Sequence, residues 1–440
     1  MSPLGSLLPA IRVEPPGPRS RQLAARLRRV ESRNVTFLTE ASPVFWEAAR
    51  GANVRDADGN VYLDLTAAFG VALGGHAQPS VLAAVEAQAA RLVHGMGDVH
   101  PPVAKVELLE ALTGVVEGAL PELDEPRAVL ANTGSEAVEV ALKTARLASG
   151  RGGVIAFEAG YHGLTLGALS ATARPYFREP FADRLPEDVT WLPFPVREEE
   201  VAPVLDRVDA LLAAGAGAVI VEPVQARGGV RIPAPGFGAG LGERTRRHGA
   251  VLIADEIYTG LGRCGSVLAS PRVGLRPDVV CLGKVLGGGL PLSACLASRA
   301  VMDAWPPSPG EALHTSTFLG HPLACAAGLA VLEDVARGLP GRADALGLRL
   351  LDGLRAGLAG VPGVRDVRGL GLLLGVEVDP GVAVEVAEEA LRRGLMVLPA
   401  GDEGQVVELS PPVVLTGEQE AHAVNTLVDI LGSAPEAGGS

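Results

Sequence analysis

The sequence predicts an α/β fold: a large domain with a mostly parallel sheet flanked by helices, plus a smaller α+β domain. Short apolar runs rich in β-branched residues alternate with longer stretches of helical periodicity, as a buried parallel sheet requires. From about residue 319 the pattern changes to long amphipathic helices with a few strands. At 440 residues the chain is long enough for two or three domains.

Residues 1–70 are expected to form an arm and a segment that packs with the small domain. The first 35 residues are rich in Pro, Arg and Ser, which predicts a loosely ordered arm with one helix over Gln22–Val30. Ala52–Leu65 predicts a β-hairpin, because two β-prone runs flank Asp-Gly-Asn. The large domain, residues 71–318, begins with a helical pattern over Pro79–Leu92.

The rest of the large domain alternates strands and helices. The predicted strands are AVLA (128–131), VIAF (154–157), AVIV (218–221), VLIA (251–254) and VVCL (279–282). The clearest helices are Ser135–Ser149, Pro203–Ala214 and Phe237–His248. Residues 319–432 are expected to form the C-terminal small domain, with strands in LGLLLGVEVD and VVEL, and residues 433–440 a disordered tail.

The composition argues against several classes of function. Hydrophobic residues make up 48% of the chain and charged residues 20%, which is ordinary for a soluble globular protein. The net charge of −13 argues against nucleic acid as a partner. The four cysteines show no CxxC spacing, so no metal site or disulfide framework is indicated. Without an apolar run long enough to span a membrane or a secretory signal, we expect no membrane partner and a cytoplasmic location.

Chemically useful side chains follow three successive strands. Glu222 follows AVIV, Asp255 follows VLIA, and Lys284 comes two residues after VVCL. Because ligands bind beyond the carboxyl ends of parallel strands, we expect these side chains to converge at one edge of the sheet. A buried ion-pair network is the simpler interpretation of any one of them, but the full set favours a binding site.

A fourth strand end points to the ligand. AVLA leads into NTGSEAVEVALKTAR, a glycine turn that opens a helix, whose N–H groups suit a phosphate. Alone this turn is more often only a helix cap. Together with a lysine and carboxylates, however, the turn indicates pyridoxal phosphate. The aldehyde of this cofactor needs an amine, its ring nitrogen needs a carboxylate, and its phosphate suits the start of a helix. Lys284, followed by VLGGG, is then the residue to be covalently bonded.

On these motifs the sequence resembles the class III aminotransferases, in the fold-type I group of pyridoxal-phosphate enzymes. The matching motifs extend from about Arg33 to Val428 and include ANTGSEAVEVALKTAR, AFEAGYHGLTLGALSAT, VEPVQARGG, LIADEIYTGLGRCG, PDVVCLGKVLGGGLPLSA and HTSTFLGHPLACAAGLAVL. The resemblance implies a transaminase that moves an amino group from an amine or amino acid to a 2-oxo acid through an aldimine (Schiff base) on Lys284.

The resemblance also implies how the ends of the cofactor are bound. Lys284 would carry the aldimine and move the proton, and Asp255 would pair with the protonated ring nitrogen. Gly134 and Ser135 would bind the phosphate. Thr317 would reach the phosphate of the other subunit's cofactor, so that a homodimer with active sites at its interface is implied.

The cofactor ring is expected to be enclosed by side chains of the same motifs. Tyr161 would stack on the ring, with His162 behind it. Ile257, or Val224, would pack on the opposite face, and Glu222 would support the pocket from below.

Three positions depart from family members that act on 4-aminobutyrate and ornithine. Those proteins have Arg where this chain has Leu164, Glu where it has Arg227, and Arg where it has Glu408. The usual dicarboxylate clamp is then absent, so specific 4-aminobutyrate or acetylornithine activity is not expected. Arg227 and Glu408 are expected to meet at the substrate pocket with reversed polarity, and Phe69 is expected to shape an apolar part of it.

Two other functions stay open at this point. A racemase or epimerase on the same scaffold would return the proton to the substrate carbon from the opposite face; the sequence shows no clear second base, which favours transamination. A non-catalytic pyridoxal-phosphate regulator would need a DNA-binding domain, and the N-terminal arm is too short and the charge too negative for one. The donor, the acceptor and the stereochemistry are not given by the sequence.

Overall fold

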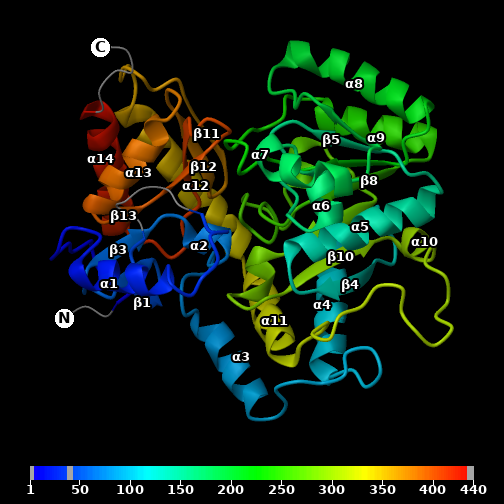
Figure 1. Ribbon diagram of the computed structural model, residues 1–440, viewed down its shortest axis with the longest axis horizontal. Coiled ribbons are helices and arrows are strands. Elements are labelled where there is room, and N and C mark those ends of the chain that lie inside the picture. Colours follow the sequence, from blue (N-terminus) through cyan, green and yellow to red (C-terminus); the bar gives the residue numbers. More distant parts are fainter. Residues whose placement is uncertain (1–3, 37–42, 434–440) are drawn as a thin grey trace. The chain divides into compact units, whose positions relative to one another are not determined.

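The computed structural model describes residues 4–36 and 43–433 and divides the chain into two compact units (Figure 1). The larger unit is Pro79–Ala343, and the smaller one combines Met1–Gln78 with Asp344–Ser440. The domain boundaries at 70/71 and 318/319 stay predictions. The expected disordered tail lies outside the described residues, apart from Ser433.

The larger unit contains a seven-stranded sheet in the order β4-β10-β9-β8-β7-β5-β6. Its strands are β4 (Arg127–Ala131), β5 (Val154–Phe157), β6 (Val189–Leu192), β7 (Ala218–Val221), β8 (Val251–Asp255), β9 (Val279–Leu282) and β10 (Ser293–Ala297). All neighbouring pairs from β9 to β6 are parallel, whereas β10 runs antiparallel to both β9 and β4. The predicted mostly parallel sheet is therefore confirmed.

Helices of the larger unit cover both faces of this sheet. They are α3 (Pro79–Ala89), α4 (Val103–Ala119), α5 (Gly134–Ser149), α6 (Leu166–Ala171), α7 (Pro175–Arg178), α8 (Glu198–Ala213), α9 (Phe237–His248), α10 (Arg299–Met302), α11 (Pro322–Ala336) and the start of α12 (Leu339–Gly357). Val219 and Val221 of β7 pack with α8 and α9, while Ile220 between them packs with α5. Alternate side chains of a strand point to opposite faces of the sheet, so a strand made entirely of apolar residues can be buried on both faces.

Two helices begin earlier than the sequence patterns predict. Helix α8 starts at Glu198 rather than at Pro203, because the carboxylate of Glu200 accepts hydrogen bonds from the N–H groups of Val196 and Arg197, and an acidic first turn stabilises an extra turn before the proline. Helix α1 (Pro18–Leu27) replaces the predicted Gln22–Val30, because the carboxylate of Asp58 accepts hydrogen bonds from N–H groups of its first turn.

The smaller unit contains two four-stranded sheets. One has the order β1 (Trp46–Arg50), β2 (Asn53–Asp56), β3 (Val61–Asp64), β13 (Leu395–Met396), and the other β11 (Asp366–Leu370), β12 (Leu373–Glu377), β15 (Val406–Leu409), β14 (Leu398–Ala400). Its helices are α1, α2 (Ala67–Gly70), most of α12, α13 (Val382–Arg392) and α14 (Gly417–Ser433). Strands β2 and β3 form the predicted hairpin, and β13 pairs parallel to β3, which joins N-terminal to C-terminal sequence.

The N-terminal arm is held more firmly than its composition predicts. Ala10 pairs with Val61 of the hairpin in a β-bridge. The buried side chain of Asn53 accepts hydrogen bonds of 2.9 Å from the N–H groups of Gly5 and Leu7. The expectation of a loosely ordered arm was therefore wrong for this segment, because a buried amide in the hairpin supplies the partners that its backbone needs.

Within the described ranges, no helix has both the length and the apolar character needed to cross a membrane. Nor do the His, Cys, Asp and Glu side chains described there gather in a group that could hold a metal ion. All four cysteines are buried and free.

Candidate active site

The carboxyl ends of β7, β8 and β9 bring Glu222, Asp255 and Lys284 to one cavity in the larger unit. The cavity has a volume of about 250 Å³. It is lined by Thr133, Gly134, Ser135, Tyr161, His162, Gly163, Glu222, Ala226, Arg227, Asp255, Ile257, Tyr258 and Lys284. The residues predicted to bind the cofactor all belong to this lining, with the exception of Thr317 and of Val224, the predicted alternative to Ile257.

Lys284 occupies a strained backbone position directly after β9. Its φ of 41° lies in the left-handed region, which is uncommon for a residue with a side chain. Its Nζ atom lies 4.2 Å from the centre of the Tyr258 ring, a distance typical of a cation–π contact. At the preceding Gly283, an added Cβ would lie only 3.2 Å from Cγ2 of Ile257. The lysine thus reaches the cavity from a closely packed turn, and Tyr258 is a lining residue that sequence reasoning missed.

Asp255 is buried at the end of β8 and is held by His162. The Nδ1–H of His162 donates to Oδ2 of Asp255 over 2.7 Å, and the N–H of Ile257 donates to Oδ1 over 3.1 Å. Burial lowers the pKa of His162, but the hydrogen bond and charge of Asp255 raise it, so that the pKa ends above its ordinary value. The ring of His162 therefore favours its protonated form beside the carboxyl group of Asp255.

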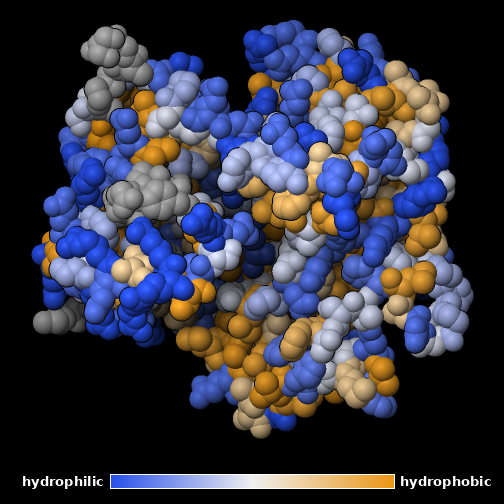
Figure 2. All heavy atoms as spheres, in the orientation of Figure 1, coloured by the Kyte–Doolittle hydropathy of each residue, from blue (hydrophilic) through white to orange (hydrophobic). Residues whose placement is uncertain are grey.

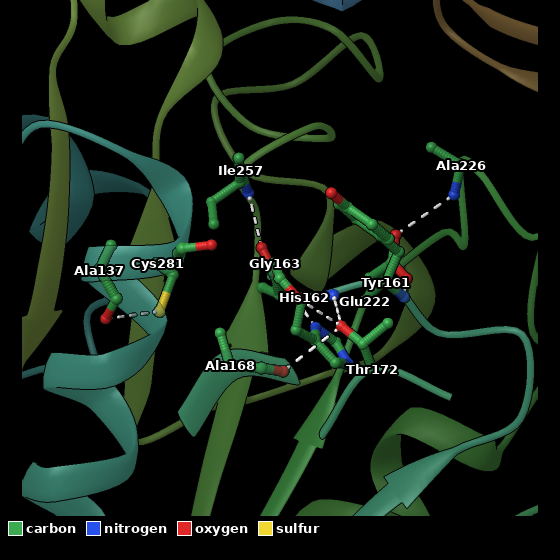
Figure 3. Close-up of polar contacts among 12 residues, drawn as sticks. Ala137, Tyr161, His162, Gly163, Ala168, Thr172, Glu222, Ala226, Ile257 and Cys281 are labelled. Atoms are coloured by element: carbon green, nitrogen blue, oxygen red, sulfur yellow. Dashed lines mark hydrogen bonds and ion pairs between the residues drawn. The ribbon is translucent and has the colours of Figure 1, made fainter. Parts of the chain in front are cut away.

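The backbone of His162 is fixed by Thr172 (Figure 3). The hydroxyl of Thr172 accepts a hydrogen bond from the N–H of His162 and donates one to the carbonyl of Gly163, both over 2.9 Å. The sequence predicts His162 behind Tyr161; in the structure its ring contacts Asp255. Thr172 lies ten residues further along, at the end of the motif AFEAGYHGLTLGALSAT, but no role was predicted for it.

Glu222 is buried and accepts hydrogen bonds from two loops (Figure 3). Its Oε1 accepts from the N–H of Tyr161 over 2.9 Å, and its Oε2 accepts from the N–H of Ala226 over 3.3 Å. Burial raises the pKa of Glu222 to about 7; the charge of His162 and the two N–H groups oppose this shift, and the charge of Asp255 adds to it. One carboxyl group thus positions both Tyr161 and the turn that carries Arg227.

The start of α5 supplies backbone N–H groups to the cavity. Thr133 and Glu136 form a capping box, for which the sequence TGSE has the typical pattern. The box satisfies the N–H of Glu136, whereas Gly134 and Ser135 precede it on the cavity wall. An added Cβ at Gly134 would lie 2.9 Å from Cδ1 of Ile257, so glycine keeps this end of the cavity open.

Strand β10 connects this helix start to the lysine-bearing strand. The hydroxyl of Ser293 donates a 2.6 Å hydrogen bond to the carbonyl of Thr133. The next residue, Ala294, pairs with Leu282, two residues before Lys284. The two ends of the cavity are therefore joined through one antiparallel strand.

The other predicted residues have different surroundings. Leu164 and Thr317 are exposed in the larger unit and are not among the described residues that line its cavity. Phe69 and Glu408 belong to the smaller unit, where Phe69 borders an apolar cavity of about 340 Å³ and Glu408 is buried in β15. The meeting of Arg227 with Glu408 stays a prediction.

This set of groups fits pyridoxal phosphate. Lys284 offers an amine, the buried Asp255 offers a carboxylate for a ring nitrogen, and the start of α5 offers N–H groups for a phosphate. Tyr161 and Ile257 are apolar walls of the kind that an aromatic ring packs against.

Comparison with known proteins agrees with this chemistry. Residues 37–431 match the family model described as aminotransferase class-III. The chain is 37% identical to the acetylornithine aminotransferase of Methanothermobacter thermautotrophicus over 89% of this chain and 93% of that protein, and 35% identical to the putrescine aminotransferase of Pectobacterium atrosepticum over 91% and 84%.

Solved structures give the same result for the fold. The ornithine aminotransferase of Toxoplasma gondii has a TM-score of 0.83 at 31% identity and covers 94% of both chains. An amine transaminase from an uncultivated Pseudomonas species, solved in its pyridoxal-phosphate-bound form, has a TM-score of 0.84 at 30% identity over 92% of this chain and 99% of that one.

We predict that Glu222 makes the free energy of unfolding of the cofactor-free chain fall as the pH rises. Its pKa is raised from about 4.5 to about 7 in the folded chain, which therefore holds an extra proton between these values. The contribution of Glu222 to the free energy of unfolding is fully present below the unfolded-state pKa of about 4.5 and is lost as the pH rises through the folded-state pKa of about 7. Relative to Glu222→Gln, the wild-type chain should lose about 3 kcal/mol between about pH 5 and pH 8, measured by urea unfolding. Parallel pH profiles of the two proteins would contradict the raised pKa.

Proposed function

Because the chain belongs to the class III aminotransferase family, which uses pyridoxal phosphate, we propose that its cavity at the ends of β7, β8 and β9 moves an amino group from an amine or amino acid to a 2-oxo acid. The observation that carries this proposal is the convergence of Lys284 and the buried Asp255 on one cavity. The racemase alternative is not favoured, because the matched relatives are named aminotransferases.

Lys284 and Asp255 are proposed to carry the chemistry. When bound, pyridoxal phosphate supplies an aldehyde carbon for the amino group and a ring that takes up negative charge. Nζ of Lys284 is the group that would bond to it and the base that would take the proton from the substrate carbon bearing nitrogen. The carboxylate of Asp255, kept in place by His162, would hold the proton on the ring nitrogen by charge.

Four other residues are proposed to hold the cofactor. Gly134 and Ser135 would donate backbone N–H groups to the phosphate, at the positive end of the α5 dipole. Tyr161 and Ile257 would enclose the ring and exclude water from it. Glu222 would act through Tyr161, whose backbone N–H it accepts.

We propose that the amino donor has no second carboxylate, because the chain lacks the arginine that would bind one. The relatives are named for different donors, acetylornithine, putrescine and ornithine. Leu164 places an exposed apolar side chain where relatives acting on 4-aminobutyrate and ornithine are expected to have arginine.

We also propose a homodimer in the cytoplasm. Thr317 is exposed and lies outside its own chain's cavity lining, as expected of a residue that serves a second copy. Apolar side chains gather over α3, α4 and α11 in the lower part of Figure 2, and Val99, Val103 and Phe318 are all more than half exposed. An exposed apolar surface of this kind suits a subunit interface. The four free thiols suit a reducing compartment.

The proposed function predicts a half-reaction without any acceptor. When the cofactor-loaded enzyme is incubated with single amines and amino acids, donors should convert it to the pyridoxamine form and release a carbonyl product. Absorbance and product analysis measure both. A substrate that is only inverted at its stereocentre, with no carbonyl product, would instead support a racemase.

Lys284→Ala should abolish turnover without unfolding the chain. Both the covalent link and the base are lost together, so activity should fall to below about a thousandth of the wild type. The cofactor should still bind and should now be removed by dialysis. Lys143→Ala, which removes an exposed lysine of the same unit, is the matched control and should keep its activity. Substantial turnover by the Lys284 variant would refute the assignment.

Asp255→Asn should keep the cofactor but lower the turnover number at least roughly a hundredfold, as for loss of a preorganised charge. The amide cannot hold the ring proton by charge, and His162 loses its charged partner. Steady-state kinetics with the best donor measure the effect, and Asp209→Asn at the surface is the control. A turnover number within about tenfold of the wild type would rule out this role.

The shared active site predicts complementation between two inactive variants. Thr317→Asp should repel the cofactor phosphate, and Lys284→Ala removes the base. If Thr317 serves the partner's cofactor, a mixed dimer has one intact site and should recover roughly half of the wild-type activity. If Thr317 serves its own chain, both sites of the mixed dimer are defective and nothing is recovered. Purifying the mixed dimer with two affinity tags makes the comparison direct.

A further inference from the structure

Arg227 lines the cavity but takes no part in the chemistry described above. It lies in the turn after β7, and its guanidinium carbon is 4.9 Å from the centre of the Tyr161 ring and 6.0 Å from that of Phe177. Aromatic rings at these distances attract a guanidinium and hold its flat face. The charge of Arg227 reaches the phenol of Tyr161, where it opposes the rise in pKa that burial causes.

The acidic groups of the cavity are engaged elsewhere. Glu222 accepts from two backbone N–H groups, and Asp255 accepts from His162 and from the N–H of Ile257. None of the described carboxylates of the larger unit forms an ion pair with Arg227. Within the larger unit, this exposed guanidinium at the cavity wall, backed by aromatic rings, is thus available to an anion.

A neighbouring arginine shows the contrast. Arg231, four residues later, stacks on Phe194 at 5.7 Å and donates a hydrogen bond to the carbonyl of that same residue. Its guanidinium serves the local fold. In contrast, the positions of Arg227 and Tyr161 relative to each other are fixed by Glu222. Its carboxyl group binds the backbone N–H of Tyr161 and that of Ala226, the residue before Arg227. A guanidinium held in this way is preorganised for a ligand.

We propose that Arg227 binds the carboxylate of the 2-oxo acid acceptor. This inference rests on the proposed function and assigns the acceptor's charged group to one residue. A guanidinium donates two parallel hydrogen bonds to a carboxylate, so it orients the acceptor as well as attracting it. Arg227 is therefore a substrate-binding residue that selects 2-oxo acids over carbonyl compounds without a carboxylate.

The test uses the half-reaction of the enzyme loaded with pyridoxamine phosphate, so no donor needs to be known. The amino nitrogen of the cofactor would pass to the acceptor, giving an amino acid from a 2-oxo acid and an amine from an aldehyde. The acceptor's carbonyl oxygen would leave as water, and the cofactor would return to its aldehyde form by addition of water or by bonding to Nζ of Lys284. Single-turnover rate constants are compared for pyruvate against acetaldehyde and for 2-oxobutyrate against propanal. Each aldehyde equals the acid without its carboxylate, so the ratio of the two rate constants isolates the contribution of that group.

Arg227→Gln should lower this ratio roughly 100-fold, as for loss of one member of a charged pair. Arg227→Lys keeps the charge without the two-pronged geometry and should lower it only roughly tenfold. Arg231→Gln is the matched control and should leave the ratio unchanged. The reaction with aldehydes also reports whether each variant has folded around its cofactor.

An unchanged ratio in Arg227→Gln, or an equal loss for acids and aldehydes, would overturn the inference while leaving the proposed function intact. A loaded wild-type enzyme that converts no 2-oxo acid would overturn the proposed function, and this inference with it.

Discussion

The 2.7 Å hydrogen bond between His162 and Asp255 joins two groups that are both buried at the carboxyl end of β8. A carboxylate in such a place is costly unless it has a charged or strongly donating partner. His162 comes from the loop after β5, so that loop must bring its imidazole to β8, and Thr172 holds the backbone in the required position. The conformation of the loop that carries Tyr161 is therefore constrained by this contact, together with the hydrogen bond from Tyr161 to Glu222.

Two neighbouring acidic residues, Glu222 and Glu256, are also buried and also need hydrogen-bond donors. Glu222 is satisfied by N–H groups of the Tyr161 loop and of the turn before Arg227. Glu256, whose pKa is raised by burial, accepts from Thr259 and from the backbone and hydroxyl of Ser270, and so closes the loop that follows β8. The loops that surround the cavity are thus shaped by the carboxylates buried beneath them, which gives a site of fixed geometry.

The sheet could largely be predicted from the sequence. Apolar runs such as 154–157 and 279–282 are too short for buried helices, and the polar residues and glycines on either side mark where each strand begins and ends. Glu222, Asp255 and Lys284 were indicated by their positions at strand ends, whereas Tyr161 and Ile257 were implied only by the family resemblance. Strand β10 escaped prediction because SACLA has only one large apolar residue, Leu296, follows a glycine-rich turn and contains no β-branched or aromatic residue. The pairing of His162 with Asp255 also escaped prediction, since 93 residues separate them and only tertiary packing brings them together.

Strand β10 makes the spacing between the two ends of the cavity a matter of hydrogen-bond register. Ser293 binds the carbonyl before α5, while Ala294 pairs with β9 just ahead of Lys284. Moving the strand by one residue would turn every side chain to the opposite face, so no intermediate spacing is accessible. The distance between the two ends of the pocket can therefore change only by whole-residue steps of the strand register. A cofactor analogue with a longer or shorter arm between its ring and its anion could not be accommodated by a small shift of this strand.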